Sequence, residues 1–100
     1  MTSPDPPANG TYLPNPHNHP IWEEIADELD RARAQHGPMA SGHEAQSVIA
    51  EEFHEFTLAV WFGVDQKGRP SDPRAEAVQI AAMAIRYILD VADRRTNDIP

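Results

Sequence analysis

The sequence contains no cysteine, a single lysine and no long apolar run. Without cysteine the chain forms neither disulfides nor thiolate metal sites, which is typical of intracellular proteins and predicts a cytoplasmic location. No apolar stretch approaches the roughly 20 residues that span a bilayer. The N-terminus also lacks the basic start and apolar core of a signal peptide. We therefore expect a soluble protein with no membrane partner.

Positive charge is scarce as well. The net charge is −8, with 16 acidic residues against 8 lysines and arginines. Because DNA and RNA backbones are bound by clusters of lysine and arginine, a nucleic-acid partner is not expected. An anionic small ligand remains compatible with this charge if a cation neutralises it. The 100 residues are enough for one small domain.

Proline is concentrated at the start of the chain, where six of the ten prolines lie within residues 1–20. Proline restricts φ and removes a backbone donor, so this segment is predicted to be an extended arm. A helical domain should follow over residues 21–95, with a short tail at 96–100. The sequence has no strand pattern and no internal repeat.

Helical spacing and terminal signals predict the first two helices. The first should span about 20–35 and stop at Gly37. The second should span about 41–62, because Ser41 followed three residues later by a glutamate forms a capping box. Their predicted core residues are Ile21, Ile25, Leu29 and Ala32 in the first helix and Ile49, Phe53, Phe56 and Val60 in the second.

A third helix should begin at Asp72-Pro73, after a polar loop, and continue to Val91 or beyond. Its broad apolar face contains Val78, Ala81, Ala82, Ile85, Ile88, Leu89 and Ala92. The opposite face contains Glu76, Gln79, Met83, Arg86 and Asp90. The fold class expected from these segments is all-α, with three main helices forming an antiparallel bundle.

The second and third helices carry acidic residues at matching spacing. On a helical wheel Glu52 borders the predicted core stripe, and Glu55 and Glu51 lie further round on the same side. Glu52 and Glu55 are three residues apart and repel each other unless a positive charge lies between them. Glu76 and Gln79 on the third helix share this spacing. If the helices are antiparallel, these oxygen atoms surround a small volume that suits Mg²⁺ or Mn²⁺ and not zinc.

Two runs of the sequence resemble a known family. The run His43 to Phe56 contains Glu51-Glu52-Phe53-His54-Glu55, and the second run extends from Glu76 to Arg86. Together they resemble the MazG-like branch of the all-α nucleoside triphosphate pyrophosphohydrolases, over about residues 30–93. The family pattern is Glu-Glu-x-x-Glu on one helix and Glu-x-x-Asp on the next.

The resemblance implies Mg²⁺-dependent hydrolysis of a nucleoside triphosphate, either NTP or dNTP, to the monophosphate and pyrophosphate. It also implies a homodimer or homotetramer in which helices from two chains complete a bundle. The small chain and its long apolar faces fit that requirement. The expected partners are therefore a nucleotide substrate and further copies of the same chain.

Site residues follow from the resemblance position by position. Glu52, Glu55, Glu76 and Gln79 would bind the metal, and Glu51 or Glu52 would orient or deprotonate the attacking water. Gln79 stands where the family has aspartate. Its amide oxygen can bind Mg²⁺, but it carries no charge and cannot act as a base.

Four residues are candidates for contacting the substrate. Arg86, Lys67 and Arg69 can pair with phosphates, and His43 can touch one near the start of its helix. For Arg86 the competing role is an ion pair with Asp90, four residues further on. For His43 the competing role is capping or simple surface exposure.

Other interpretations of the same residues remain open. Glutamates beside an apolar stripe are commonly the solvated face of a helix, since glutamate is a good helix former. The alternative function is a non-catalytic helical dimer of the same fold that binds a nucleotide or a protein partner, and Gln79 is the residue that favours it. Trp61 and Phe62 fit either base stacking or a subunit interface, and the enrichment of aromatic residues at interfaces favours the latter.

Overall fold

The computed structural model describes residues 15–94, and this part of the chain is helical with no strand. It contains α1 (Ile21–His36), α2 (Gly42–Phe62) and α3 (Pro73–Tyr87), and a π-helical turn, η1 (Ile88–Ala92), continues α3. The all-α prediction is confirmed. The predicted arm before residue 15 and the tail at 96–100 lie outside the described residues. No helix within 15–94 is long and apolar enough to cross a membrane.

The helix ends follow from the capping residues. At the start of α2 the hydroxyl of Ser41 accepts a hydrogen bond from the Glu44 N–H at 3.1 Å. The carboxylate of Glu44 accepts in return from the Ala40 N–H at 3.0 Å, one residue before the cap, so the return bond of the predicted capping box is shifted by one position. Gly63 ends α2 at φ 69°, a left-handed conformation that glycine adopts without strain. Asp72 caps α3 through its side chain.

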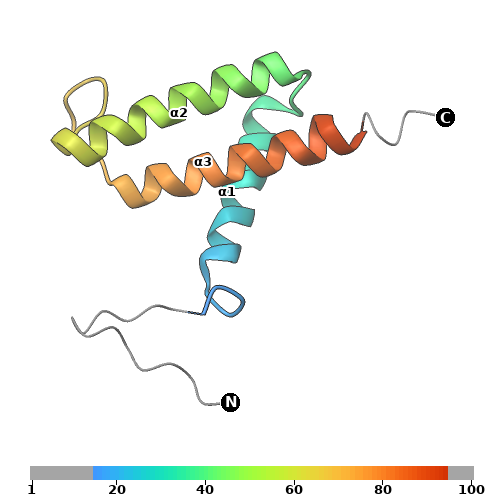
Figure 1. Ribbon diagram of the computed structural model, residues 1–100, viewed down its shortest axis with the longest axis horizontal. Helices are drawn as coiled ribbons and strands as arrows, with labels where there is room; N and C mark the ends of the chain where they lie inside the picture. Colours follow the sequence, from blue (N-terminus) through green and yellow to red (C-terminus); the bar gives the residue numbers. More distant parts are fainter. Residues whose placement is uncertain (1–14, 95–100) are drawn as a thin grey trace.

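The helices α2 and α3 lie side by side and run in opposite directions, whereas α1 crosses this pair steeply and packs against α3 (Figure 1). An antiparallel bundle of all three helices is therefore not confirmed. The core lies where α1, α3 and the connection before α2 meet. Its members are Ile25, Ala32, Met39, Ala45, Ala82, Met83 and Val91.

The face of α2 that packs inward differs from the predicted one. Phe53 is 60% exposed and Val60 51%, so the prediction that both belong to the core is wrong within this chain. The buried residues of α2 are Ala45 and Ala59, whose small side chains allow a neighbouring helix to approach closely. Because a helix turns about 100° per residue, positions 45, 52 and 59 lie almost on one line. The inward stripe of α2 therefore has Glu52 at its centre.

The face that α3 and its continuation η1 turn inward is also partly polar. Arg86 is only 2% exposed and Asp90 is buried, whereas Ile88 and Leu89, on the predicted apolar face, are exposed. This arrangement is stable only because the buried charges have partners. The apolar pattern of the sequence predicted Ile88 and Leu89 in the interior. In the structure Arg86 and Asp90 are buried instead, because they have partners for their charges.

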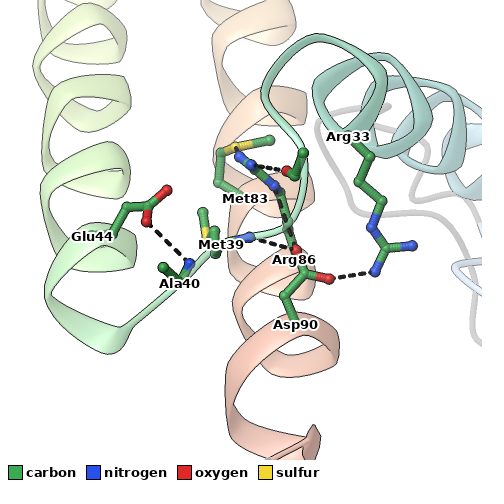
Figure 2. A network of polar contacts seen from close by, with 8 residues as sticks. Arg33, Met39, Ala40, Glu44, Met83, Arg86 and Asp90 are labelled. Carbon is green, nitrogen blue, oxygen red and sulfur yellow. Dashed lines mark hydrogen bonds and ion pairs between the residues drawn. The ribbon is translucent and has the colours of Figure 1, made fainter.

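The buried charges form a network that ties the connection after α1 to the end of α3 (Figure 2). The carboxylate of Asp90 accepts hydrogen bonds from the Arg33 guanidinium at 2.7 Å and from the Met39 N–H at 3.0 Å. Arg86 donates to the Gly37 carbonyl at 2.5 Å, and its Nε lies 3.6 Å from Asp90. Burial alone would raise the pKa of Asp90, but these donors and cations hold it below its ordinary value.

Candidate functional site

The acidic residues of α2 and α3 line one groove of about 490 Å³, which we call the carboxylate groove. α2 and α3 reach it from opposite sides, and the loop between them closes one end. Its lining includes Glu51, Glu52, Glu55, Lys67, Arg69, Glu76 and Gln79. The four glutamates and Gln79 predicted from the sequence to form the site therefore line the same groove. Two of the three predicted basic substrate contacts, Lys67 and Arg69, line it as well.

Glu52 occupies the most unusual environment in this groove. Its pKa is raised from 4.5 to about 7. Burial is the largest cause, and the negative charges of neighbouring carboxylates add to it, namely those of Glu76, Glu51, Glu55 and Glu28. The effect of Glu76 shows that the carboxylates of α2 and α3 interact across the helix pair. Without a cation in the groove, ionising Glu52 is therefore unfavourable.

The carboxylates of the groove have little positive charge to balance them. Within residues 15–94, no lysine or arginine forms an ion pair with Glu51, Glu52, Glu55 or Glu76. Glu76 accepts a hydrogen bond from the Ser71 hydroxyl at 3.2 Å, which orients it from the loop side. The groove thus contains more negative charge than Lys67 and Arg69 in its lining and the nearby Arg31 can balance.

The loop that closes the groove is held by Asp65. Its carboxylate accepts hydrogen bonds from the backbone N–H of Lys67 at 2.8 Å and of Arg69 at 2.9 Å, and from Arg69 Nε at 2.9 Å. These contacts, with the Arg69 N–H foremost, lower the pKa of Asp65. Gly68 takes φ 78° at the turn. Arg69 is consequently engaged with Asp65, whereas the Lys67 side chain makes no ion pair in the described part of the chain.

Two of the predicted substrate contacts lie elsewhere. Arg86 lines a neighbouring groove, and its guanidinium is engaged with the Gly37 carbonyl and Asp90. The ion pair with Asp90 that competed with a substrate role is therefore present. His43 is exposed near the start of α2 and lines a separate depression that also contains Ser41.

Sequence reasoning missed Glu28 of α1, which acts electrostatically on Glu52. Glu28 forms an ion pair with Arg31, and its side chain is only 17% exposed. A signal was present in the sequence. Positions 25, 28, 29 and 32 follow the spacing of one helix face, so Glu28 interrupts an otherwise apolar stripe. Its role depends on α1 crossing next to α2 and α3, which no helical pattern indicates.

The groove has the donor chemistry for a hard divalent cation but does not form a closed cage. No three carboxylates or histidines between residues 15 and 94 stand close enough together to enclose a metal ion. Mg²⁺ commonly uses only one or two carboxylates and completes its shell with water and substrate phosphate oxygens. The groove fits that open type of site if one or two of the oxygen ligands offered by Glu52, Glu55, Glu76 and Gln79 hold the ion.

Fold and site together define a small all-α protein with a carboxylate-lined groove between two antiparallel helices. Comparison with protein-family models found no match, and comparisons with curated proteins and with solved structures found none either. The MazG-like resemblance therefore stays a prediction from the sequence motifs.

Proposed function

We propose that this protein is a Mg²⁺-dependent nucleotide pyrophosphohydrolase that converts a nucleoside triphosphate to the monophosphate and pyrophosphate. The observation that carries this proposal is the excess of negative charge in the carboxylate groove between α2 and α3. A divalent cation would neutralise that charge and a polyphosphate would complete its coordination. The motif resemblance points to the same reaction.

The reaction places distinct demands on the residues of the groove. Water attacks the α-phosphorus, the bond from that phosphorus to the bridging oxygen breaks, and pyrophosphate leaves. Bound Mg²⁺ would supply charge neutralisation at the phosphate oxygens. Glu52 lies among the other carboxylates, so we assign it to the cation together with Glu55, while the charge of Glu76 acts on Glu52 from across the helix pair. Glu51 is more exposed at the edge of the groove, and we assign it to the attacking water.

The cations of the loop have separate roles in this proposal. Lys67 has no carboxylate partner among residues 15–94 and can pair with the outgoing pyrophosphate. Arg69 keeps the loop in place through Asp65 and reaches the phosphates only by giving up that ion pair. Gln79 contributes a neutral oxygen, so the site would bind Mg²⁺ more weakly than one with an aspartate there.

We further propose that two copies of the chain associate through exposed apolar residues of α2. Phe53 and Val60 are seven residues apart and share one face of α2, and Trp61 next to them is 75% exposed. Burying such residues against a second copy removes apolar surface from water. If the groove proved inactive, this face would support the alternative of a non-catalytic helical dimer.

Pyrophosphate release tests the proposed reaction. The purified chain is incubated with a panel of ribo- and deoxynucleoside triphosphates in Mg²⁺, in Mn²⁺ and in EDTA. We expect metal-dependent release that Glu52→Gln and Glu55→Gln abolish and that Glu23→Gln, an exposed change on α1, leaves intact. Glu51→Gln should lower kcat while Mg²⁺ binding is retained. Absence of release from every nucleotide in both metals would refute the proposal, and recovery of release in Gln79→Asp would identify Gln79 as the reason.

A further inference from the structure

A second groove lies directly beside the carboxylate groove, on the side where α1 crosses. It also measures about 490 Å³, and we call it the α1-side groove. Both grooves are lined by Glu51, Glu52 and Gln79, so a single ligand can extend from one into the other without leaving the surface. Each groove alone has the size of an ordinary small-molecule site.

The two grooves differ in chemistry. Most residues that line the α1-side groove are polar or charged, but Ala32 of α1, Val48 of α2 and Met83 of α3 give it a small apolar part. No Ala, Val, Leu, Ile, Met or aromatic residue lines the carboxylate groove within the described residues. A flat, weakly polar group is therefore better accommodated on the α1 side, where it can pack against methyl groups and a thioether.

The two grooves also differ in whether their basic side chains are already paired with carboxylates. In the α1-side groove Arg31 is paired with Glu28, and Arg86 with Asp90. Lys67, on the other groove, has no such partner within residues 15–94. A polyphosphate is thus favoured beside Lys67 and the carboxylate-bound cation, and the remainder of a nucleotide is left to extend past Gln79 toward α1.

We infer that the α1-side groove holds the nucleoside of the substrate, and that Gln35 reads the polar edge of the base. This inference rests on the proposed function. Gln35 is exposed on the last turn of α1 and lines this groove. Its side-chain oxygen accepts only a long hydrogen bond of 3.4 Å from Arg31. Because an amide both donates and accepts, it can pair with a base edge once that weak contact is released.

Binding measurements by calorimetry test this assignment in the presence of Mg²⁺. The probes are α,β-imido analogues of the four deoxynucleoside triphosphates, which resist cleavage at that bond, and inorganic tripolyphosphate, which lacks a nucleoside. The variants are Gln35→Ala and, as a matched control, Gln46→Ala, an exposed glutamine of α2 that lies in a different depression.

We expect the analogues to bind at least tenfold more tightly than tripolyphosphate. Gln35→Ala should weaken the preferred analogue about fivefold, the usual effect of one lost hydrogen bond, and leave tripolyphosphate unchanged. Gln46→Ala should alter neither. The assignment is overturned if the analogues bind no better than tripolyphosphate, or if Gln35→Ala weakens both probes equally.

Failure of this inference is distinguishable from failure of the proposed function. If nucleotides are hydrolysed but tripolyphosphate binds as tightly as the analogues, the reaction stands and the nucleoside assignment falls. If the analogues follow the expected pattern but no nucleotide is hydrolysed, the groove is a nucleotide-binding site and the enzymatic proposal falls. If neither probe binds, both are refuted.

Discussion

Replacing Glu52 with glutamine removes the charge at the centre of the inward stripe of α2 while keeping the size of the side chain. In the folded chain the pKa of Glu52 is about 7, compared with an ordinary value of 4.5. Between these values the folded state binds more protons than the unfolded state. Stability of the wild type therefore falls as pH rises from about 4.5 to about 7 and stays low above that range.

The size of the effect follows from the two pKa values. At full strength their difference corresponds to about 3 kcal/mol. The side chain is only half-buried, so solvent screening reduces this figure, and we expect Glu52→Gln to raise the free energy of unfolding by about 1–2 kcal/mol at pH 8. The same substitution should have little effect at pH 4, where the wild-type side chain is already protonated.

Urea unfolding followed by circular dichroism measures this difference at pH 4 and pH 8, with EDTA present throughout. Glu23→Gln provides the control, because it removes a charge from an exposed position on α1 and should change stability by no more than about 0.5 kcal/mol. A Glu52→Gln protein that is no more stable than wild type at pH 8, or that gains equally at both pH values, would show that burial and the neighbouring carboxylates do not raise the pKa of Glu52.

Four further changes probe other parts of the molecule. Asp90→Ala leaves the buried Arg86 and the partly exposed Arg33 without their carboxylate and should cost about 3 kcal/mol in urea unfolding; a loss below about 1 kcal/mol would contradict the role of the network. Ser41→Ala removes the cap of α2 and should cost about 1 kcal/mol in the same assay, so an unchanged midpoint would argue against that cap. Mg²⁺ should raise the Tm of the wild type but not of Glu55→Gln, and equal increases would place the cation elsewhere. Trp61→Ser should shift the mass measured by light scattering from dimer to monomer with helicity unchanged, whereas a monomeric wild type would refute self-association.

Glu52 has opposite consequences for stability and for the proposed function. Its ionised form destabilises the empty groove, and the same negative charge would attract a divalent cation. Proteins commonly retain such unfavourable charges where a ligand compensates for them, and substitutions there stabilise the fold at the expense of activity. The predicted gain in stability and the predicted loss of pyrophosphate release in Glu52→Gln are therefore two results of one electrostatic arrangement.

Local signals in the sequence were sufficient to predict the ends of α1 and α2 and the start of α3, but not the change from α3 to the π-helical η1 after Tyr87. The Ser41 capping box, Gly63 and the Asp72-Pro73 start act within a few residues, so neighbouring positions alone decide them. The spacing of Glu51, Glu52 and Glu55 also placed these carboxylates on one side of α2 before any packing was known. Such features depend on helix geometry, which is the same in every protein.

Which face of each helix turns inward depends on contacts between segments far apart in the chain. The apolar residues of α2 extend around more than one face, so hydrophobicity did not distinguish Ala45 and Ala59 from Phe53 and Val60. In η1 the burial of Asp90 depends on a hydrogen bond from the Met39 N–H, 51 residues away in the chain, and on an ion pair with Arg33, 57 residues away. Contacts at that distance leave no periodic trace in the sequence, because each helix alone satisfies its own pattern equally well in several orientations.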